Sequence, residues 1–357
     1  MHMFGINKPH FLGIDFGTSY IKAVELTLKN GLPVLANYGH IEMSFTEGRD
    51  ALFPAQSPEN MIREHFKALL EALHPVSKTM NLALPGFSGL ITLIELPLMK
   101  PEELEQAIPF EAHKYIPSPL EEVAFSWEVL SSSKGSGGIQ EKKVMEVLLV
   151  AALRKEVAKY ERYVVDTGLA VDLLELEIFP LVRSIAGDKT GMVLVVDIGS
   201  RATNLVLTQN GEIRLNRSLN AGGNEITSTL AESFHVSWER AEELKRGTKD
   251  FLNNRESSLA FSSLDLVTSE ISRILQMHAT KHASDPVREM VLSGGTARMQ
   301  GLSSYFSNLF HIPVSIADPW RGVQYDDALR SSLDRLGPSF SIAIGLALGG
   351  VERYRKK

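Results

Sequence analysis

FLGIDFGTS at residues 11–19 and VLVVDIGS at residues 193–200 decide the fold of this chain. Each stretch reads as an apolar strand that ends in Asp-x-Gly and small polar residues. Each is followed by a second strand-like run that ends at an Asn-Gly pair, at residues 30–31 and 210–211. Asn-Gly between two strand-like runs is a strong hairpin signal. Because the two copies repeat the same order of elements, the chain is predicted to contain two similar lobes that face each other.

The two Asp-x-Gly turns carry residue types that hold a polyphosphate and its metal ion. A tight glycine turn exposes successive backbone N–H groups, which bind phosphate oxygens. An aspartate at the end of a buried strand is a hard oxygen ligand suited to Mg²⁺, directly or through water. The expected magnesium ligands are Asp15 and Asp197, and the expected phosphate contacts are Gly17, Thr18, Ser19, Gly199 and Thr203. For either copy alone, a plain turn between strands is the alternative.

Lys22 follows the first turn and has two possible roles. Its ammonium group reaches a phosphate, or it faces solvent, since the two-residue alternation of a strand puts it on the same face as Tyr20.

Two glycine pairs predict further parts of a nucleotide site. Gly222-Gly223 precedes an amphipathic run for which Asn224 is the expected N-cap, and a helix N-terminus beside such a turn is a site for an anion or a ribose. The apolar strand that ends at Ser293 runs into Gly294-Gly295 and then, we expect, directly into a helix. Glycine there lets the backbone lie close to a flat ring such as adenine. A simple turn is again the alternative for each pair.

In order and spacing, these elements resemble the actin-like ATPase superfamily over nearly the whole chain. The two Asp-x-Gly turns resemble its phosphate motifs, and residues 292–299 resemble its adenosine motif. The resemblance implies an α/β fold of two RNase H-like lobes, with ATP and Mg²⁺ in the cleft between them. It also implies ribose and adenine contacts from Glu242 and Lys245, and an adenine pocket lined by Gly294, Gly295 and Arg298. Taken alone, Glu242 and Lys245 could equally be a surface ion pair.

The segment between the lobes narrows this resemblance. IELPLM at 94–99, EELEQAI at 102–108 and FEAHKYIPSPLEEV at 110–123 are similar to the PilM family of cytoplasmic actin-like proteins of type IV pilus assembly. So are MFGINK at 3–8, VSIADPW at 314–320 and FSIAIGLAL at 340–348. The resemblance implies that the short cytoplasmic N-terminal tail of PilN, an inner-membrane pilus protein, docks between lobe one and the inserted segment. Self-assembly into rings or filaments is a secondary expectation from the superfamily.

The pattern of elements divides the chain into three parts. Lobe one comprises residues 11–84, 154–190 and 338–357, the inserted subdomain comprises 85–153, and lobe two comprises 191–337. The insertion is predicted as strand 90–96, helix 101–115, strand 123–130 and strand 144–151, with a hairpin tip rich in Ser and Gly at 131–138. The last helix, about 340–354, is expected to pack back on lobe one.

Hydrolysis of ATP needs a group that orients water. In superfamily relatives a Glu or Gln begins the helix after the strand that follows the insertion. Glu177 occupies that place here as the candidate catalytic residue, and Glu175 is its rival. The alternative is a carboxylate in the first turn of a helix, which interacts favourably with the helix dipole. We therefore expect ATP binding and leave turnover open.

The composition excludes several other classes of protein. The chain has 357 residues, a net charge of −6 and no cysteine, which excludes disulfide frameworks and cysteine-ligated metal sites. A mildly acidic chain lacks the basic face of a general nucleic-acid binder, and the first ten residues lack the apolar run of a signal peptide. We expect a cytoplasmic protein that is peripheral to the inner membrane through its partners in a pilus assembly complex. An FtsA-like division tether and a small-molecule kinase of the same fold are the alternatives.

Overall fold

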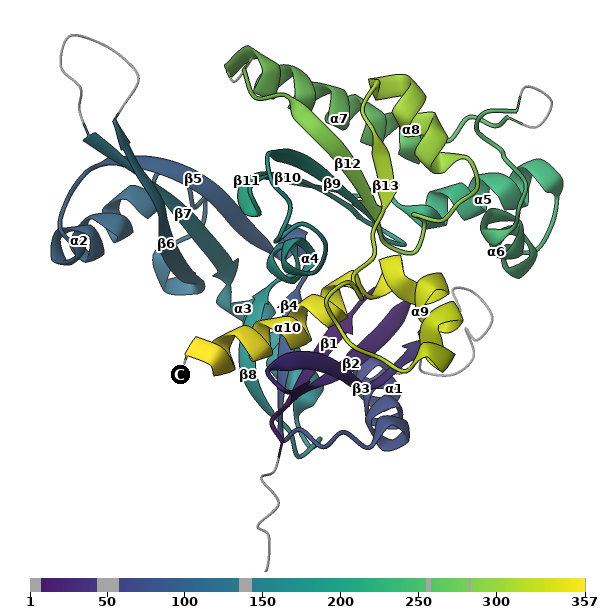
Figure 1. Ribbon diagram of the computed structural model, residues 1–357, viewed down its shortest axis with the longest axis horizontal. Coiled ribbons are helices and arrows are strands. Elements are labelled where there is room, and N and C mark those ends of the chain that lie inside the picture. The colour runs from purple at the N-terminus through teal and green to yellow at the C-terminus, as the bar shows by residue number, and fades with distance from the viewer. Residues whose placement is uncertain (1–7, 44–57, 135–142, 255–257, 282–283, 357) are drawn as a thin grey trace, which may run out of the picture.

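The computed structural model describes residues 8–43, 58–134, 143–254, 258–281 and 284–356. Within these ranges the strands form two five-stranded sheets and one three-stranded sheet (Figure 1). The predicted MFGINK segment lies outside the described residues, apart from Lys8.

The sheet of lobe one is built around the first Asp-x-Gly stretch. Its strands are β1 (His10–Phe16), β2 (Tyr20–Lys29), β3 (Leu32–Glu42), β4 (Thr79–Leu84) and β8 (Ala170–Leu176), in the order β3-β2-β1-β4-β8. β1, β2 and β3 are antiparallel neighbours, whereas β4 is parallel to β1 and β8 is parallel to β4. The β2–β3 turn has φ of 53° at Asn30 and 77° at Gly31, which is the left-handed geometry that an Asn-Gly hairpin requires.

The sheet of lobe two repeats this topology, which confirms the predicted duplication. Its strands are β9 (Met192–Ile198), β10 (Thr203–Gln209), β11 (Glu212–Leu219), β12 (Val287–Ser293) and β13 (Val314–Ile316), in the order β11-β10-β9-β12-β13. Its Asn-Gly turn has φ of 53° at Asn210 and 82° at Gly211, which are close to the values in lobe one. Both Asp-x-Gly turns therefore leave the same end of equivalent strands.

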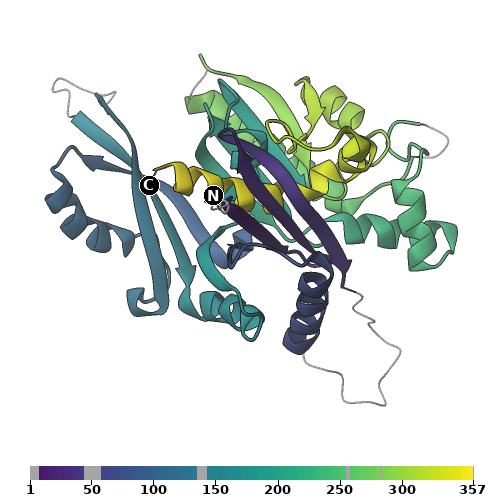
Figure 2. The same ribbon diagram turned by 60° about the horizontal axis from the view of Figure 1, so that its bottom comes forward.

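The inserted subdomain has the predicted order of strand, helix, strand and strand. It consists of β5 (Gly89–Pro97), α2 (Pro101–Ala112), β6 (Val123–Lys134) and β7 (Lys143–Leu153), with β7 in the middle of the sheet. Helix α2 ends three residues before the predicted Tyr115, and its Leu104 and Ile108 lie in the core of the subdomain. The first half of the predicted hairpin tip, residues 131–134, is strand and ends β6, and its second half, residues 135–138, lies outside the described residues. Figures 1 and 2 show the subdomain projecting to one side of the two lobes.

Helices cover both faces of each large sheet. In lobe one, α1 (Pro58–Leu73) and α3 (Arg154–Val164) share a core with one face of the sheet. In lobe two, α5 (Gly223–Phe234), α7 (Ser262–Lys281) and α8 (Leu302–Phe310) share a core with one face, while α6 (Trp238–Arg246) packs on α5. The other faces of the two sheets meet α4 (Ile178–Ile185) and α10 (Ser341–Lys356), which Figure 1 shows between the lobes.

Close backbone contact sets the position of α10. An added Cβ at Gly13 of β1 would lie 2.3 Å from the Ala343 carbonyl oxygen, and one at Gly345 would lie 1.9 Å from the Pro180 carbonyl oxygen of α4. Only glycine permits these approaches. The last helix therefore packs on lobe one, as predicted, and also crosses α4.

The chain returns to lobe one earlier than the predicted boundary at residue 337. Trp320, Val323 and Leu333 share a core with Val24 and Leu26 of β2. The Gln324 N–H also donates to the Pro33 carbonyl oxygen at 2.9 Å. This connection includes η3 (Asp327–Leu329), α9 (Arg330–Leu336) and η4 (Gly337–Phe340), and its apolar side chains pack on lobe one although it follows the strands of lobe two directly.

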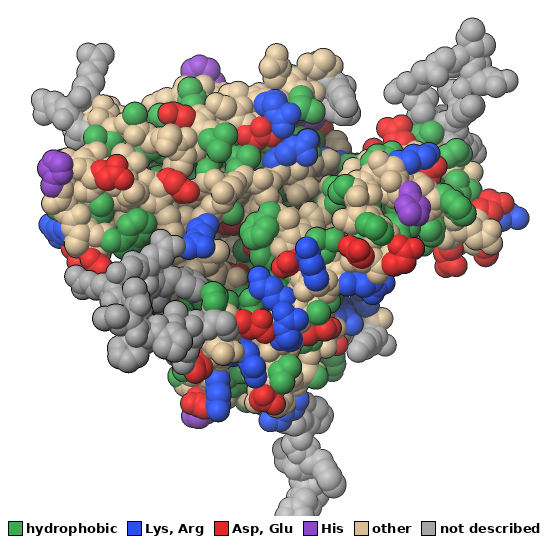
Figure 3. All heavy atoms as spheres, turned by 180° about the vertical axis from the view of Figure 1, so that it is seen from behind, with side chains coloured by type: hydrophobic (Ala, Val, Ile, Leu, Met, Phe, Trp, Pro, Cys, Tyr) green, Lys and Arg blue, Asp and Glu red, His purple; other side chains and the backbone are tan. Residues whose placement is uncertain are grey.

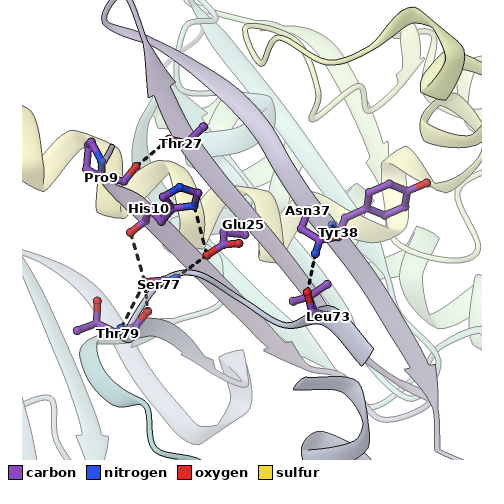
Figure 4. A network of polar contacts seen from close by, with 9 residues as sticks. All are labelled: Pro9, His10, Glu25, Thr27, Asn37, Tyr38, Leu73, Ser77 and Thr79. Atoms are coloured by element: carbon purple, nitrogen blue, oxygen red, sulfur yellow. Dashed lines mark hydrogen bonds and ion pairs between the residues drawn. The ribbon is translucent and has the colours of Figure 1, made fainter. Parts of the chain in front are cut away.

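A buried polar network holds the end of lobe one that lies away from Asp15 (Figure 4). Glu25 is 2% exposed, and its Oε1 accepts the Ser77 N–H at 2.7 Å and lies 3.5 Å from His10 Nδ1. The Ser77 hydroxyl donates to the Thr79 carbonyl oxygen at 2.6 Å. A buried carboxylate needs such donors because its desolvation is otherwise costly. The network joins β1, β2 and β4.

Among the described helices, none is at once long enough and apolar enough to span a bilayer. Figure 3 shows basic and acidic side chains interspersed over the back of the molecule.

Candidate nucleotide site between the lobes

The two Asp-x-Gly turns meet between the lobes. Asp15 and Asp197 are the penultimate residues of β1 and β9. Asp15 is 4% exposed and Asp197 is 7% exposed. Thr18 and Ser200, one from each turn, are hydrogen-bonded through their hydroxyl groups. The fold thus brings together the two stretches that the sequence separates.

Each aspartate faces a polar side chain on the neighbouring antiparallel strand. Asp15 is paired in register with Lys22, and Asp197 is paired in register with Asn204. The spacing of seven residues is the same in both lobes, because both turns have the same length. Lys22 Nζ lies 3.2 Å from Asp15 Oδ2, and its side chain is 16% exposed. Of the two roles expected for Lys22, the structure places it toward the carboxylates and away from solvent.

Burial and the nearby charge of Asp15 make Asp197 a weaker acid than an ordinary aspartate. Its pKa is raised to about 6, chiefly by burial and further by the charge of Asp15. Hydrogen bonds from Ser293 and Asn204 and the positive charge of Lys22 act in the opposite direction. A divalent cation would relieve the repulsion between these carboxylates, since it favours their charged form. The aspartates therefore fit a magnesium ion.

The ligand set suits Mg²⁺ that is held mainly by phosphates and water. Among the described residues, no three His, Asp or Glu side chains are arranged to hold a metal ion by themselves. Mg²⁺ commonly uses one or two carboxylates and keeps phosphate and water ligands. Asp15 and Asp197 match that requirement.

Glu177 lies at the junction of the lobes, immediately before α4. Its Oε1 accepts the Gly86 N–H at 2.7 Å and Asn204 Nδ2–H at 2.8 Å. Burial raises the pKa of Glu177 to about 7, and the charges of Asp15 and Asp197 add to this effect. The side chain is thus within the electrostatic reach of both aspartates and titrates near neutral pH.

The rival carboxylate, Glu175, is engaged elsewhere. Its two oxygens accept from Arg183 at 2.7 and 2.9 Å, and Arg183 also donates to the Gly345 carbonyl oxygen of α10. Glu177 follows the end of β8, and within the described part of the chain Glu175 makes no hydrogen bond to Gly86 or Asn204, the partners of Glu177.

The glycine pair at 222–223 packs on the second turn. The N–H groups of Gly223 and Asn224 each donate at 2.8 Å to the carbonyl oxygens of Gly199 and Ser200. An added Cβ at Gly222 would lie 2.7 Å from the Ser200 carbonyl oxygen. The predicted N-cap, Asn224, is wrong by two residues, because α5 begins at Gly223 and its N-cap is Gly222. Only glycine can lie this close to the backbone of the second turn.

Glu242 and Lys245 form a partly buried pair. Lys245 Nζ lies 2.6 Å from Glu242 Oε2 and donates to Thr227 Oγ1 at 2.8 Å and to the Gly223 carbonyl oxygen at 3.1 Å. Burial lowers the pKa of Lys245, while the Glu242 charge opposes this. Lys245 is 6% exposed, so the surface ion pair considered from the sequence is not what the structure contains. The pair braces the start of α5.

The second glycine pair joins the same group of backbones. An added Cβ at Gly294 would lie 2.3 Å from the Ile198 carbonyl oxygen, whereas one at Gly295 would meet no atom within 4 Å. Residues 294–301 form turns, and α8 begins only at Leu302. The expected direct passage into a helix is therefore wrong, since the glycines leave the strand in turns. Gly295 remains open to a flat ligand.

The remaining predicted contacts differ in position. The Thr203 hydroxyl is fully buried and donates to the Ala221 carbonyl oxygen at 2.7 Å, so it braces the turn and is not exposed for a phosphate contact. The Arg298 guanidinium donates to the carbonyl oxygen of Asp334, which lies in the last turn of α9. The Ser19 carbonyl oxygen accepts the Met43 N–H at 2.8 Å, which anchors the first turn to β3.

Several residues that make polar contacts in this region were missed from the sequence. They are Gly86, Asn204, Ser218, Ser293, Tyr20 and Arg246. Asn204 had a signal, because it stands seven residues after Asp197 as Lys22 does after Asp15. Arg246 of α6 hydrogen-bonds Tyr20, the first residue of β2, and so connects the two lobes.

Comparison with known proteins places this geometry in a family. The family model described as type IV pilus assembly protein PilM matches residues 13–351. A solved structure titled PilM-PilN type IV pilus biogenesis complex is 26% identical and has a TM-score of 0.78, with 96% of this chain and 98% of that chain covered.

More distant relatives share the fold. Cell division protein FtsA of Pseudomonas aeruginosa is 22% identical over 385 residues, which cover 96% of this chain and 89% of that protein. MreB5 of Spiroplasma citri bound to AMPPNP is 12% identical, with a TM-score of 0.50 and coverage of 97% of this chain and 98% of that chain. These likenesses identify the actin-like architecture.

Proposed function

The chain belongs to the family of the type IV pilus assembly protein PilM, and on that premise we propose that it is an ATP-binding component of the pilus assembly machinery. In this proposal it binds Mg-ATP between its lobes and the cytoplasmic N-terminal tail of a PilN-like inner-membrane protein beside its inserted subdomain. The observation that carries the proposal is the meeting of Asp15 and Asp197 between two sheets of the same topology.

The residues support a nucleotide in the cleft. Backbone N–H groups of the turns at Gly17 and Gly199 are suited to phosphate oxygens. Magnesium supplies charge neutralisation of the phosphates when it is bound, and Asp15 and Asp197 would hold it. Gly222, Gly223, Glu242 and Lys245 would lie toward the ribose, and Gly294 and Gly295 toward the adenine. Arg298 would close the adenine end.

Turnover is a separate part of the proposal. Glu177 is held between two donors, and its raised pKa suits a group that exchanges a proton near neutral pH. It would orient the attacking water, since phosphoryl transfer depends mainly on positioning and charge stabilisation. A slow ATPase and an ATP-dependent scaffold that does not turn over differ only at this step.

The inserted subdomain supports the partner. The solved complex named above contains PilN, and the likeness to it covers the insertion. Ile91, Val150 and Ala152 of the subdomain pack against the core of lobe one, and this contact forms the seam between the two. A short extended tail is a form of ligand that docks in such a groove. Binding there would keep the protein cytoplasmic and peripheral to the inner membrane.

Two measurements test the proposal. Isothermal titration with Mg-ATP should show one site, and EDTA should abolish or strongly weaken binding. An immobilised peptide with the N-terminal sequence of a PilN-like protein from the same organism should retain it, whereas a scrambled peptide should not. Retention by anionic liposomes without any peptide would instead favour an FtsA-like tether, which the match to FtsA makes the second candidate.

A further inference from the structure

Asn204 contacts Ser218, Asp197 and Glu177 through one amide group. It lies on β10 of lobe two and is 3% exposed. Ser218 of β11 donates its hydroxyl to Asn204 Oδ1 at 2.7 Å, so the carbonyl side of the amide faces Ser218. The NH₂ side therefore faces the carboxylates, where Nδ2 donates to Glu177 at 2.8 Å and the side chain also hydrogen-bonds Asp197. An amide has two N–H donors, and the Glu177 carboxylate accepts one of them.

The same oxygen of Glu177 also binds the link to the inserted subdomain. Gly86 donates its N–H to Glu177 Oε1 at 2.7 Å and is the first residue of the turn η1 (Gly86–Ser88). That turn leads directly into β5, the first strand of the insertion. An added Cβ at Gly86 would lie 2.7 Å from Ser218 Oγ and 2.8 Å from Asn204 Oδ1. The link is thus packed against the side chains that orient Glu177.

A second contact connects the insertion to the same strand of lobe two. Arg214 of β11 donates to Glu146 of β7 at 2.8 Å, with both side chains less than one-third exposed. Since Ser218 also lies on β11, this strand carries both the residue that orients Asn204 and the residue that holds the insertion.

We propose that Asn204 is a positioning residue that couples the cleft to the inserted subdomain, because its amide holds the Glu177 carboxylate in the orientation that receives Gly86. A change in the other hydrogen bonds of Glu177 then changes the strength of the hydrogen bond that its carboxylate accepts from the Gly86 N–H. Gly86 begins the turn that leads into β5. The proposal rests on the proposed function in one respect, namely that Mg-ATP is the ligand that changes the environment of Glu177. The coupling needs no movement of the sheets, since one carboxylate touches both sides.

The charged groups around Glu177 determine how it titrates. Asp15 from β1 and Asp197 from β9 are negative neighbours, and the Tyr160 hydroxyl from α3 lies within their influence. Lys22 from β2 is the positive group facing the aspartates. Loss of the Asn204 donor removes a hydrogen bond to the charged carboxylate and should therefore raise its pKa.

The first test uses glycine-selective ¹⁵N labelling and needs no ligand. The Gly86 amide shift should titrate with pH, with a midpoint near that of Glu177. Asn204→Leu should raise this midpoint by about half a pH unit or more, and Ser218→Ala should raise it by less, because it removes only the orientation of the amide. Ser228→Ala on α5, whose hydroxyl contacts Glu232 at 3.0 Å, is the matched control and should leave it unchanged. A Gly86 amide that does not titrate, or equal midpoints in wild type and Ser218→Ala, would overturn the proposal.

The second test adds Mg-ATP to the same samples. In the wild type, the amides of Gly86 and Gly89, the first residue of β5, should both shift. Ser218→Ala should lose the response at Gly89 while it still binds Mg-ATP by titration calorimetry. An undiminished response at Gly89 would refute the coupling. If Mg-ATP does not bind the wild type, the proposed function fails, and the pH titration still decides whether Asn204 positions Glu177.

Discussion

The hydroxyl groups of Thr18 and Ser200 are hydrogen-bonded to each other, although 182 positions separate them in the chain. Each belongs to one of the two Asp-x-Gly turns, so this contact joins the turns directly. A polyphosphate held by the backbone N–H groups of both turns would lie between these hydroxyls and separate them. On the proposed function, this contact would therefore report whether nucleotide is bound.

We expect Mg-ATP to protect this contact from cross-linking. The chain has no cysteine, so a Thr18→Cys, Ser200→Cys double variant carries the only thiols. Without nucleotide it should form an intramolecular disulfide under mild oxidation, and saturating Mg-ATP should slow the reaction at least several-fold. Gel mobility under non-reducing conditions measures the rate, and each single variant is the control. A disulfide that forms equally fast with bound Mg-ATP would contradict the placement of phosphates between the turns.

Replacement of the aspartates should separate stability from nucleotide binding. Asp15→Asn and Asp197→Asn each remove a hard oxygen ligand and should abolish most of the thermal stabilisation by Mg-ATP, since a ligand stabilises only the state that it binds. Because the pKa of Asp197 is raised, its charge opposes folding above about pH 6. Asp197→Asn should therefore melt no lower than wild type at pH 8 without ligand. Unchanged ATP affinity in both variants would remove the aspartates from the site.

Glu177→Gln tests the raised pKa of this residue through stability. The folded pKa is about 7 and the ordinary value is 4.5, so the wild type loses stability as pH rises between these values, because the carboxylate must then be buried in its charged form. Gln keeps the acceptor for Gly86. The variant should match wild type near pH 4.5 and exceed it above pH 7 by on the order of 3 kcal/mol. Denaturant unfolding at four pH values measures the difference, and a constant difference across this range would be the contrary result.

The same variant tests turnover. Single-turnover phosphate release at saturating Mg-ATP should be at least several-fold slower in Glu177→Gln, with ATP affinity unaltered in order of magnitude. Release at the wild-type rate would exclude Glu177 as the residue that orients water. A wild type without release over hours would identify an ATP-dependent scaffold.

Charge reversal at the seam should affect the partner and not the nucleotide. Arg154 is the exposed first residue of α3, where the chain leaves the insertion, and its Nε–H donates to the Glu121 carbonyl oxygen at 3.0 Å. Arg154→Glu should weaken binding of the PilN-like tail at least several-fold while Mg-ATP affinity stays unchanged. Lys67→Glu, on the exposed face of α1, is the matched control. If neither seam nor control variant alters peptide binding in a fluorescence anisotropy titration, the tail docks elsewhere.

The duplicated stretches determined the architecture by themselves. The apolar runs that end in Asp-x-Gly, the equal loop lengths and the Asn-Gly turns are local features, because strand periodicity and left-handed turn conformations depend on residues close together in sequence. The positions of Asp15 and Asp197 at strand ends followed directly from them. The same local pattern, together with the insertion, also led to the family that the comparisons show.

Only the tertiary structure decided how the pieces touch. Whether Lys22 faced solvent or a carboxylate, and whether Glu175 or Glu177 lay at the cleft, depended on which helix and which lobe covered each strand face. Gly86 carried no signal of its own, because its role comes from Asn204 and Ser218, which lie more than a hundred residues away. A hydrogen bond between distant residues depends on the packing of whole elements, and no local pattern in the sequence encodes its partner.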